Sequence, residues 1–171
     1  MMKTSGHEHA FSEFVVQYQE RLYRVIYRMV NDVELARDIL QDTFLSGYEH
    51  LDRFAGQSSL YTYFYRIALN KSISHLRKAR IRRWNPIDLV EHMLADPKED
   101  ALISLIHSEN EKRIGRVIEQ LPARQKAIFI SRINEELSFK EIAEMLEITE
   151  SAARSNFFQA LQKIKKEFRH E

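Results

Sequence analysis

The sequence predicts an all-α protein of two small helical domains joined by a flexible linker, the C-terminal domain being a helix-turn-helix. Only four glycines and three prolines occur in 171 residues, too few turn-forming residues for a many-stranded sheet. Apolar residues recur at three- and four-residue spacing, the periodicity of an amphipathic helix. Hydrophobic residues make up 44% and charged residues 30% of the chain, which is enough apolar surface for a folded core.

Residues 11–83 are expected to form the first domain, after a disordered N-terminus over 1–10. Its three helices are predicted to span 11–30, 33–51 and about 59–83. Ser58 or Ser59 can cap the third helix, after a loop that contains Gly56.

Residues 84–100 are expected to be the linker, because they contain Pro86, Pro97 and several acids without a sustained period. The helical pattern resumes in the second domain, residues 101–171. Its last three helices are predicted to span 123–133, 138–146 and about 150–168.

The last two of these helices have the pattern of a helix-turn-helix. Ser138 followed by Glu141 has the spacing of a capping box just before an apolar run. Glu147 lies in the turn, where Gly or Asn would adopt a positive φ more easily. Polar and basic side chains gather on one face of the last helix, as in a helix that enters the major groove: Ser151, Arg154, Ser155, Phe158, Gln162, Lys165 and Lys166. The alternative is an ordinary solvated helix.

Charge is segregated along the chain, although the net charge is only +1. Residues 61–83 contain seven Lys or Arg and no Asp or Glu, and acidic stretches flank them. Such a block favours a polyanionic partner, with nucleic acid before an anionic membrane. One helical stripe of this block combines an aromatic with polar and basic groups, which suits single-stranded nucleic acid: Tyr63, Arg66, Asn70, Ser74 and Arg77, flanked by Lys71 and Lys78. The alternatives are a core position for Tyr63 and a solvated basic face.

Several classes of function are excluded or disfavoured. The glycines are too far apart for a P-loop or a dinucleotide-binding turn, and the absence of cysteine excludes disulfides, thiolate nucleophiles and Cys-based zinc sites. The only Glu-x-x-His spacing is Glu167/His170, at the end of the chain, so a helical di-iron enzyme is disfavoured. We therefore expect no enzyme, no cofactor and no metal. Without an apolar signal core or a membrane span, a cytoplasmic location is expected.

Three segments together resemble a bacterial RNA polymerase sigma factor of the extracytoplasmic-function (ECF, group IV) class in the sigma-70 family. They are DVELARDILQDTFLSGYEHLDRF (32–54), SSLYTYFYRIALNKSISHLRK (58–78) and LPARQKAIFISRINEELSFKEIAEMLEITESAARS (121–155). The resemblance covers roughly 11–83 and 101–168, and it implies regions 2 and 4 of that family.

The resemblance also implies partners and site residues. It implies that Asp38, Gln41, Asp42 and Phe44 dock on the β′ clamp helices of core RNA polymerase. The core polymerase, including its β subunit, is therefore an expected partner. Loop 52–59 and Asn70 match positions that capture a flipped base of the −10 element, and Arg154, Ser155 and Phe158 match the helix that reads the −35 element. An anti-sigma factor is a further expected partner.

Two residues depart from the family pattern. Many relatives have Trp where this chain has Tyr63, and Arg often stands where it has Gln159. Gln can pair with adenine edges, which would shift the base preference.

The expected function is a dissociable subunit that directs core polymerase to promoters, with promoter DNA bound as melted −10 strand and as −35 duplex. The alternative is a stand-alone helix-turn-helix regulator, which would bind a duplex site by itself.

Overall fold

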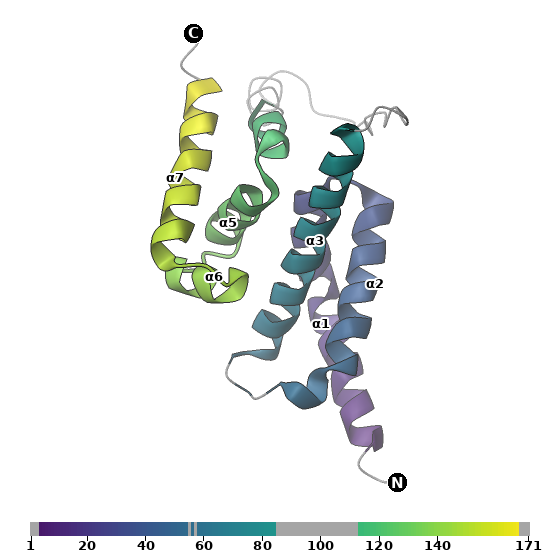
Figure 1. Cartoon of the computed structure of the whole chain (residues 1–171). Coiled ribbons are helices and arrows are strands. Elements are labelled where there is room, and N and C mark those ends of the chain that lie inside the picture. Colours follow the sequence, from purple (N-terminus) through teal and green to yellow (C-terminus); the bar gives the residue numbers. More distant parts are fainter. Residues whose placement is uncertain (1–3, 55, 57, 85–112, 168–171) are drawn as a thin grey trace, which may run out of the picture. The chain divides into compact units, whose positions relative to one another are not determined.

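The computed structural model describes residues 4–54, 56, 58–84 and 113–167. Every regular element in these ranges is a helix (Figure 1), which confirms the all-α class. The helices form two compact units, with α1, α2 and most of α3 in the first and α5, most of α6 and α7 in the second. The predicted linker lies outside the described residues, apart from Trp84. None of the described helices is both long and apolar enough to cross a bilayer.

Helix α1 spans Thr4–Val30 and begins earlier than predicted. The expected disorder over 1–10 is therefore wrong for residues 4–10, and residues 1–3 lie outside the described part of the chain. Extending an existing helix by one residue has little cost, because each added residue gains a backbone hydrogen bond. A contact of 3.5 Å between His9 Nε2 and Glu13 Oε1 also connects the added turns to the rest of the helix.

Helix α2 (Val33–Glu49) runs antiparallel to α1 (Figure 1). The chain reverses at Asn31, which has a left-handed φ of 51°, and the Asp32 carboxylate caps α2 by accepting the Leu35 N–H at 2.8 Å. A 3-10 turn, η1 (Leu51–Arg53), follows α2. The helix predicted over 33–51 is therefore present, with its last two residues outside α2.

Helix α3 (Leu60–Trp84) begins where Ser59 Oγ accepts the Thr62 N–H at 3.1 Å, so Ser59 is the capping residue. The core of the first unit contains a cluster of aromatic rings centred on Phe64. Its ring centroid lies 4.9 Å from that of Phe14 and 5.7 Å from that of Phe44. Phe64 also packs against Gly47 of α2, where a Cβ atom would overlap the ring. Glycine at position 47 therefore lets α3 approach α2 closely.

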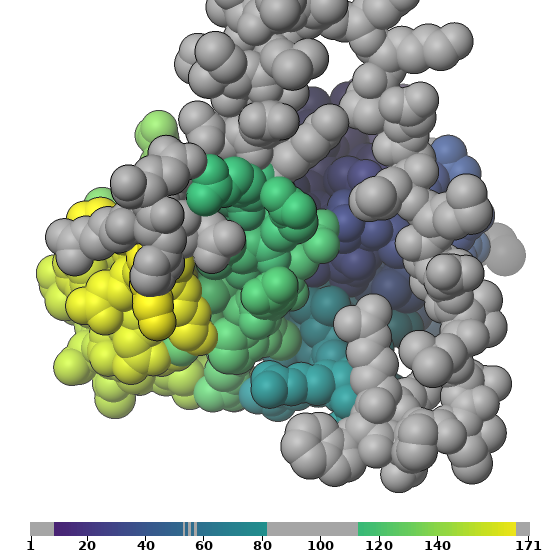
Figure 2. Space-filling model, turned by 90° about the horizontal axis from the view of Figure 1, so that it is seen from above, coloured from purple at the N-terminus to yellow at the C-terminus, as the bar shows by residue number. Residues whose placement is uncertain are grey.

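The second unit contains helical residues 113–120, α5 (Ala123–Asn134), α6 (Phe139–Leu146) and α7 (Glu150–Glu167). Helices α5 and α7 lie side by side, as Figures 1 and 2 both show. Phe157 of α7 packs between Phe129 and Phe139, with centroid distances of 5.9 and 5.5 Å. These three helices agree with the predicted ranges, and α6 and α7 form the predicted helix-turn-helix.

The turn between α6 and α7 adopts a helix-terminating motif. Glu147 has a positive φ of 53°, and the Ile148 N–H donates to Ala143 O at 3.0 Å. This is the bond of a Schellman motif, which usually contains Gly at the left-handed position. Glu147 therefore adopts the expected turn geometry at a conformational cost. Thr149 Oγ1 then caps α7 by accepting the Ala152 N–H at 3.1 Å.

The Gly47→Ala substitution should destabilise the first unit by about 1–3 kcal/mol, since the new methyl group overlaps the fully buried Phe64 ring. Urea unfolding followed by circular dichroism measures the change. Gly115→Ala is the matched control, because nothing lies within 4 Å of its added Cβ and alanine favours a helix. Equal stabilities for Gly47→Ala and wild type would contradict the close helix packing.

The Ser138→Ala substitution should destabilise the second unit by about 1 kcal/mol at pH 7, through loss of the α6 cap. Ser138 Oγ donates to Glu141 Oε2 at 2.7 Å, the Ser138 N–H donates to the same atom at 2.8 Å, and both bonds lower the pKa of Glu141. A lowered pKa gives stability that is complete above the unfolded-state value, about 4.3, and is lost as the pH falls through the folded-state value. The stability gap between variant and wild type should therefore narrow below about pH 4. A gap that widens on acidification would contradict the capping box.

Candidate nucleic-acid interface

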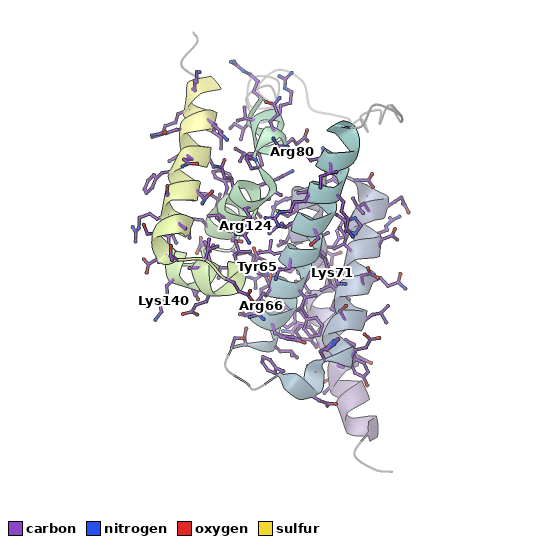
Figure 3. All side chains as sticks on the ribbon, viewed as in Figure 1. Tyr65, Arg66, Lys71, Arg80, Arg124 and Lys140 are labelled. Atoms are coloured by element: carbon purple, nitrogen blue, oxygen red, sulfur yellow. The ribbon has the colours of Figure 1, made fainter. Side chains whose placement is uncertain are left out.

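The predicted stripe of α3 is largely accessible. Its polar and basic residues are exposed: Arg66, Asn70, Ser74, Arg77 and Lys78. Phe64, Ala68 and Leu69 are buried on the opposite side of the helix. Figure 3 shows Arg66 and Lys71 along α3, one turn or more apart. An exposed row of donors and cations on one helix face can follow a phosphate backbone.

Tyr63 of this stripe and the flanking Lys71 are partly engaged within the protein. Tyr63 is half-buried, its ring packs against Phe54 at 5.2 Å, and its hydroxyl donates to Gly47 O at 3.4 Å. Lys71 is also half-buried, with its Nζ 3.9 Å from Asp42 Oδ2. Tyr63 is therefore anchored to α2 and exposes only part of its ring.

The loop before α3 is described only in part, because residues 55 and 57 lie outside the described residues. Gly56 has a positive φ of 68°, a conformation that glycine adopts without strain. Ser58 and Ser59 are exposed, but the Ser59 hydroxyl is already engaged by the helix cap.

The predicted docking residues of α2 fall into two groups. Asp38, Gln41 and Asp42 are exposed, whereas Phe44 is half-buried in the aromatic cluster. Leu45 is 56% exposed, and it follows Asp38, Gln41 and Asp42 at helical spacing on the same face. Leu45 was not among the predicted docking residues, although its position in the sequence is out of phase with the buried residues of its helix.

On α7, the whole predicted reading face is accessible. Its exposed members are Ser151, Arg154, Ser155, Phe158, Gln159 and Gln162. Phe158 is 50% exposed, an unusual position for a large apolar ring, and its covered side contacts Phe157 at a centroid distance of 5.7 Å. Exposed guanidinium, amide and hydroxyl groups on one helix can form hydrogen bonds with base edges in a major groove.

Arg154 has two intramolecular contacts. Its Nη2 donates to Glu150 Oε1 at 2.9 Å, and its guanidinium carbon lies 4.8 Å from the centroid of the Phe139 ring. Arg132 contacts the same ring at 5.2 Å. Phe139 therefore holds the Arg154 side chain against α6, a contact that sequence reasoning did not find.

Gln159 also has an intramolecular partner. Gln125 of α5 donates to Gln159 Oε1 at 2.8 Å, and Lys163 Nζ donates to Gln125 Oε1 at 2.9 Å. The neighbouring Lys126 is buried, and this burial lowers its pKa while the charge of Glu119 raises it. Gln125 and Lys163 were absent from the predicted site, because helical periodicity gives no information about polar pairs between helices.

Comparisons with known proteins agree with this geometry. The chain matches the family models described as Sigma-70 region 2 over residues 14–82 and Sigma-70, region 4 over residues 111–164. The RNA polymerase sigma-H factor of Pseudomonas aeruginosa is 32% identical over 170 residues, which cover 94% of this chain and 87% of that protein. The ECF RNA polymerase sigma factor SigW of Bacillus subtilis is 29% identical over 174 residues, which cover 96% and 91%.

A solved structure shares the fold. It is the sigma factor RpoE of Bartonella quintana, in complex with the anti-sigma factor NepR, with a TM-score of 0.72 and 15% identity over 95% of this chain and 98% of that one. The ECF RNA polymerase sigma-E factor of Salmonella typhimurium (strain LT2) is also 32% identical, over 93% of this chain and 86% of that protein. Both family models, together with the identity and coverage of the Pseudomonas and Salmonella proteins, lead to one conclusion. The chain belongs to the ECF class of the sigma-70 family, the subunits that direct RNA polymerase to promoters.

Proposed function

We propose that this sigma factor contacts its promoter through two separate faces, the exposed stripe of α3 for the melted −10 strand and the exposed face of α7 for the −35 duplex. The observation that carries the proposal is the exposure of Asn70 and Arg154, each on a helix that buries another side. An inward position for either residue would have excluded contact with DNA.

At the −10 element, Asn70 supplies an amide that can donate to and accept from the edge of an unstacked base. Arg66, Arg77 and Lys78 provide positive charge along the strand. Extrusion of a base has a free-energy cost of a few kcal/mol, which a fixed pocket with stacking surfaces offsets. The anchored Tyr63 ring can provide part of that stacking surface, because its hydroxyl contact with Gly47 holds it in place.

At the −35 element, Arg154 reads the major groove after exchanging its contact with Glu150 for the DNA. The ion pair is exposed, so breaking it has a small cost, typically below about 1 kcal/mol. The contact with Phe139 restricts the side chain before binding, which reduces the entropy lost when the guanidinium docks.

The docking face on α2 combines Asp38, Gln41, Asp42 and the exposed apolar Leu45. We propose that the β′ clamp helices of core polymerase bind here. An apolar side chain within a polar rim is the usual composition of a protein interface. Because Lys71 lies beside Asp42, this face adjoins the DNA-binding stripe of α3.

We further propose that the chain acts by binding, without catalysis of its own, in the cytoplasm where polymerase and promoter DNA are found. The solved structure of similar fold supports an anti-sigma partner, because RpoE is bound there to the anti-sigma factor NepR. In vitro transcription with core polymerase, followed by mapping of start sites, tests the function. A gel shift by the free chain as strong as that by holoenzyme would instead favour a stand-alone regulator.

The Arg154→Ala substitution should weaken promoter binding by holoenzyme by about 1–3 kcal/mol, through loss of a groove contact. Transcription from a promoter with an intact −35 element measures the effect, and pull-down with core polymerase should be unchanged. Arg24→Ala is the matched control, because Arg24 also has an exposed i,i+4 ion pair, with Glu20. Loss of polymerase binding in Arg154→Ala would show that α7 has a different role.

The Leu45→Ala substitution should weaken binding to core polymerase about tenfold, as expected when an interface residue that contributes more than 1 kcal/mol is truncated. Titration of core polymerase with labelled sigma factor measures the affinity. Val16→Ala removes an apolar side chain that is 72% exposed on α1 and should have no effect. Equal affinities for the Leu45 variant and wild type would exclude this face as the docking site.

A further inference from the structure

A chain of hydrogen bonds connects α5 to the reading face of α7. Lys163 Nζ donates to Gln125 Oε1 at 2.9 Å, and Gln125 Nε2 donates to Gln159 Oε1 at 2.8 Å. Gln125 is only 8% exposed, so the link lies at the packed junction of the two helices. Gln159 is exposed at the other end of the link.

The chemistry of lysine sets the direction of this chain. A lysine ammonium can donate hydrogen bonds but cannot accept them, so the group of Gln125 that faces Lys163 is its carbonyl oxygen. The amino group of Gln125 then faces Gln159 and requires an acceptor there. The carbonyl oxygen of Gln159 supplies that acceptor, which leaves its own amino group to face away from α5.

We propose that Gln125 is a positioning residue that presents Gln159 to the −35 duplex as a hydrogen-bond donor. The inference rests on the proposed function of α7. A donor at this position favours base edges that accept, such as guanine O6 and N7 or thymine O4, and disfavours the cytosine amino group. Pairing with an adenine edge through both ends of the Gln159 amide would require its carbonyl oxygen to turn toward the DNA, whereas in this structure that oxygen faces Gln125.

The Gln125→Glu substitution should reverse the preference. A carboxylate at position 125 has nearly the same shape, accepts from Lys163, and accepts again from the Gln159 amino group. Gln159 would then rotate its amide and present its carbonyl oxygen to the DNA. The favoured base should change to one that offers a donor, cytosine or adenine, with relative transcription changing about tenfold for one hydrogen bond.

The experiment measures transcription by holoenzyme on promoters in which each −35 base pair is varied in turn. Gln125→Met, which removes both hydrogen bonds, should reduce the base preference at the Gln159 position without reversing it. The Gln159→Glu substitution is a second test, at an exposed residue where a change of side chain should not affect folding. Holoenzyme with this variant should lose the preference for guanine and thymine. Gln120→Glu adds the same charge at an exposed position of residues 113–120 and should behave as wild type.

The inference is overturned if both Gln125 variants keep the base preference of wild type while Arg154→Ala changes it. It is also overturned if Gln159→Glu weakens transcription equally on all the promoters, because that result indicates a phosphate contact. A different result, in which neither wild type nor Arg154→Ala responds to any −35 base, would contradict the proposed function of α7 itself.

Discussion

The packing of the Phe64 ring against the Gly47 backbone determines which side of α3 is buried, and the predicted −10 surface depends on that choice. A helix turns by about 100° per residue, so rotation of α3 about its axis by the angle of one residue would move Asn70 and Arg66 toward the core. The aromatic cluster around Phe64 opposes such a rotation, because Phe14 and Phe44 contact the same ring from α1 and α2. Phe157 has the equivalent place in the second unit, where it packs between Phe129 and Phe139. In both units, aromatic packing on one side of a helix fixes the orientation of the polar side.

Several polar groups on these faces have intramolecular partners in the free protein. Lys71 pairs with Asp42, Arg154 with Glu150 and Gln159 with Gln125. DNA must replace or share the first two of these contacts, which reduces the affinity that either face contributes alone. The bond between Gln125 and Gln159 stays in place and orients the Gln159 amide. Two weak faces held on one polymerase give strong binding through effective concentration, provided that both sites on the promoter can be reached together. Under this account, specificity belongs to the holoenzyme.

The sequence predicted the helices and the helix-turn-helix because long amphipathic periods and the Ser138–Glu141 spacing are local signals. It also predicted the exposure of Asn70 and Arg154, since helical phase follows from the apolar stripe. The predicted start of the first helix, residue 11, was wrong. No residue before Phe11 continues the apolar period, but helix α1 begins at Thr4. Contacts such as Gln125 with Gln159 join residues 34 positions apart, and no local pattern encodes them. The exposed Leu45 was detectable in principle from its phase on α2.

Two separate faces of this chain should contact two separate promoter elements only within holoenzyme. The chain contains no cysteine, so Ser74→Cys on α3 and Ser155→Cys on α7 each provide a single attachment point for a DNA-cleaving iron chelate. With core polymerase and a mapped promoter, we expect the Ser74 probe to cut at the −10 element and the Ser155 probe at the −35 element, with little cutting by the free chain. Cutting by both probes within one element, or equal cutting without polymerase, would contradict the account.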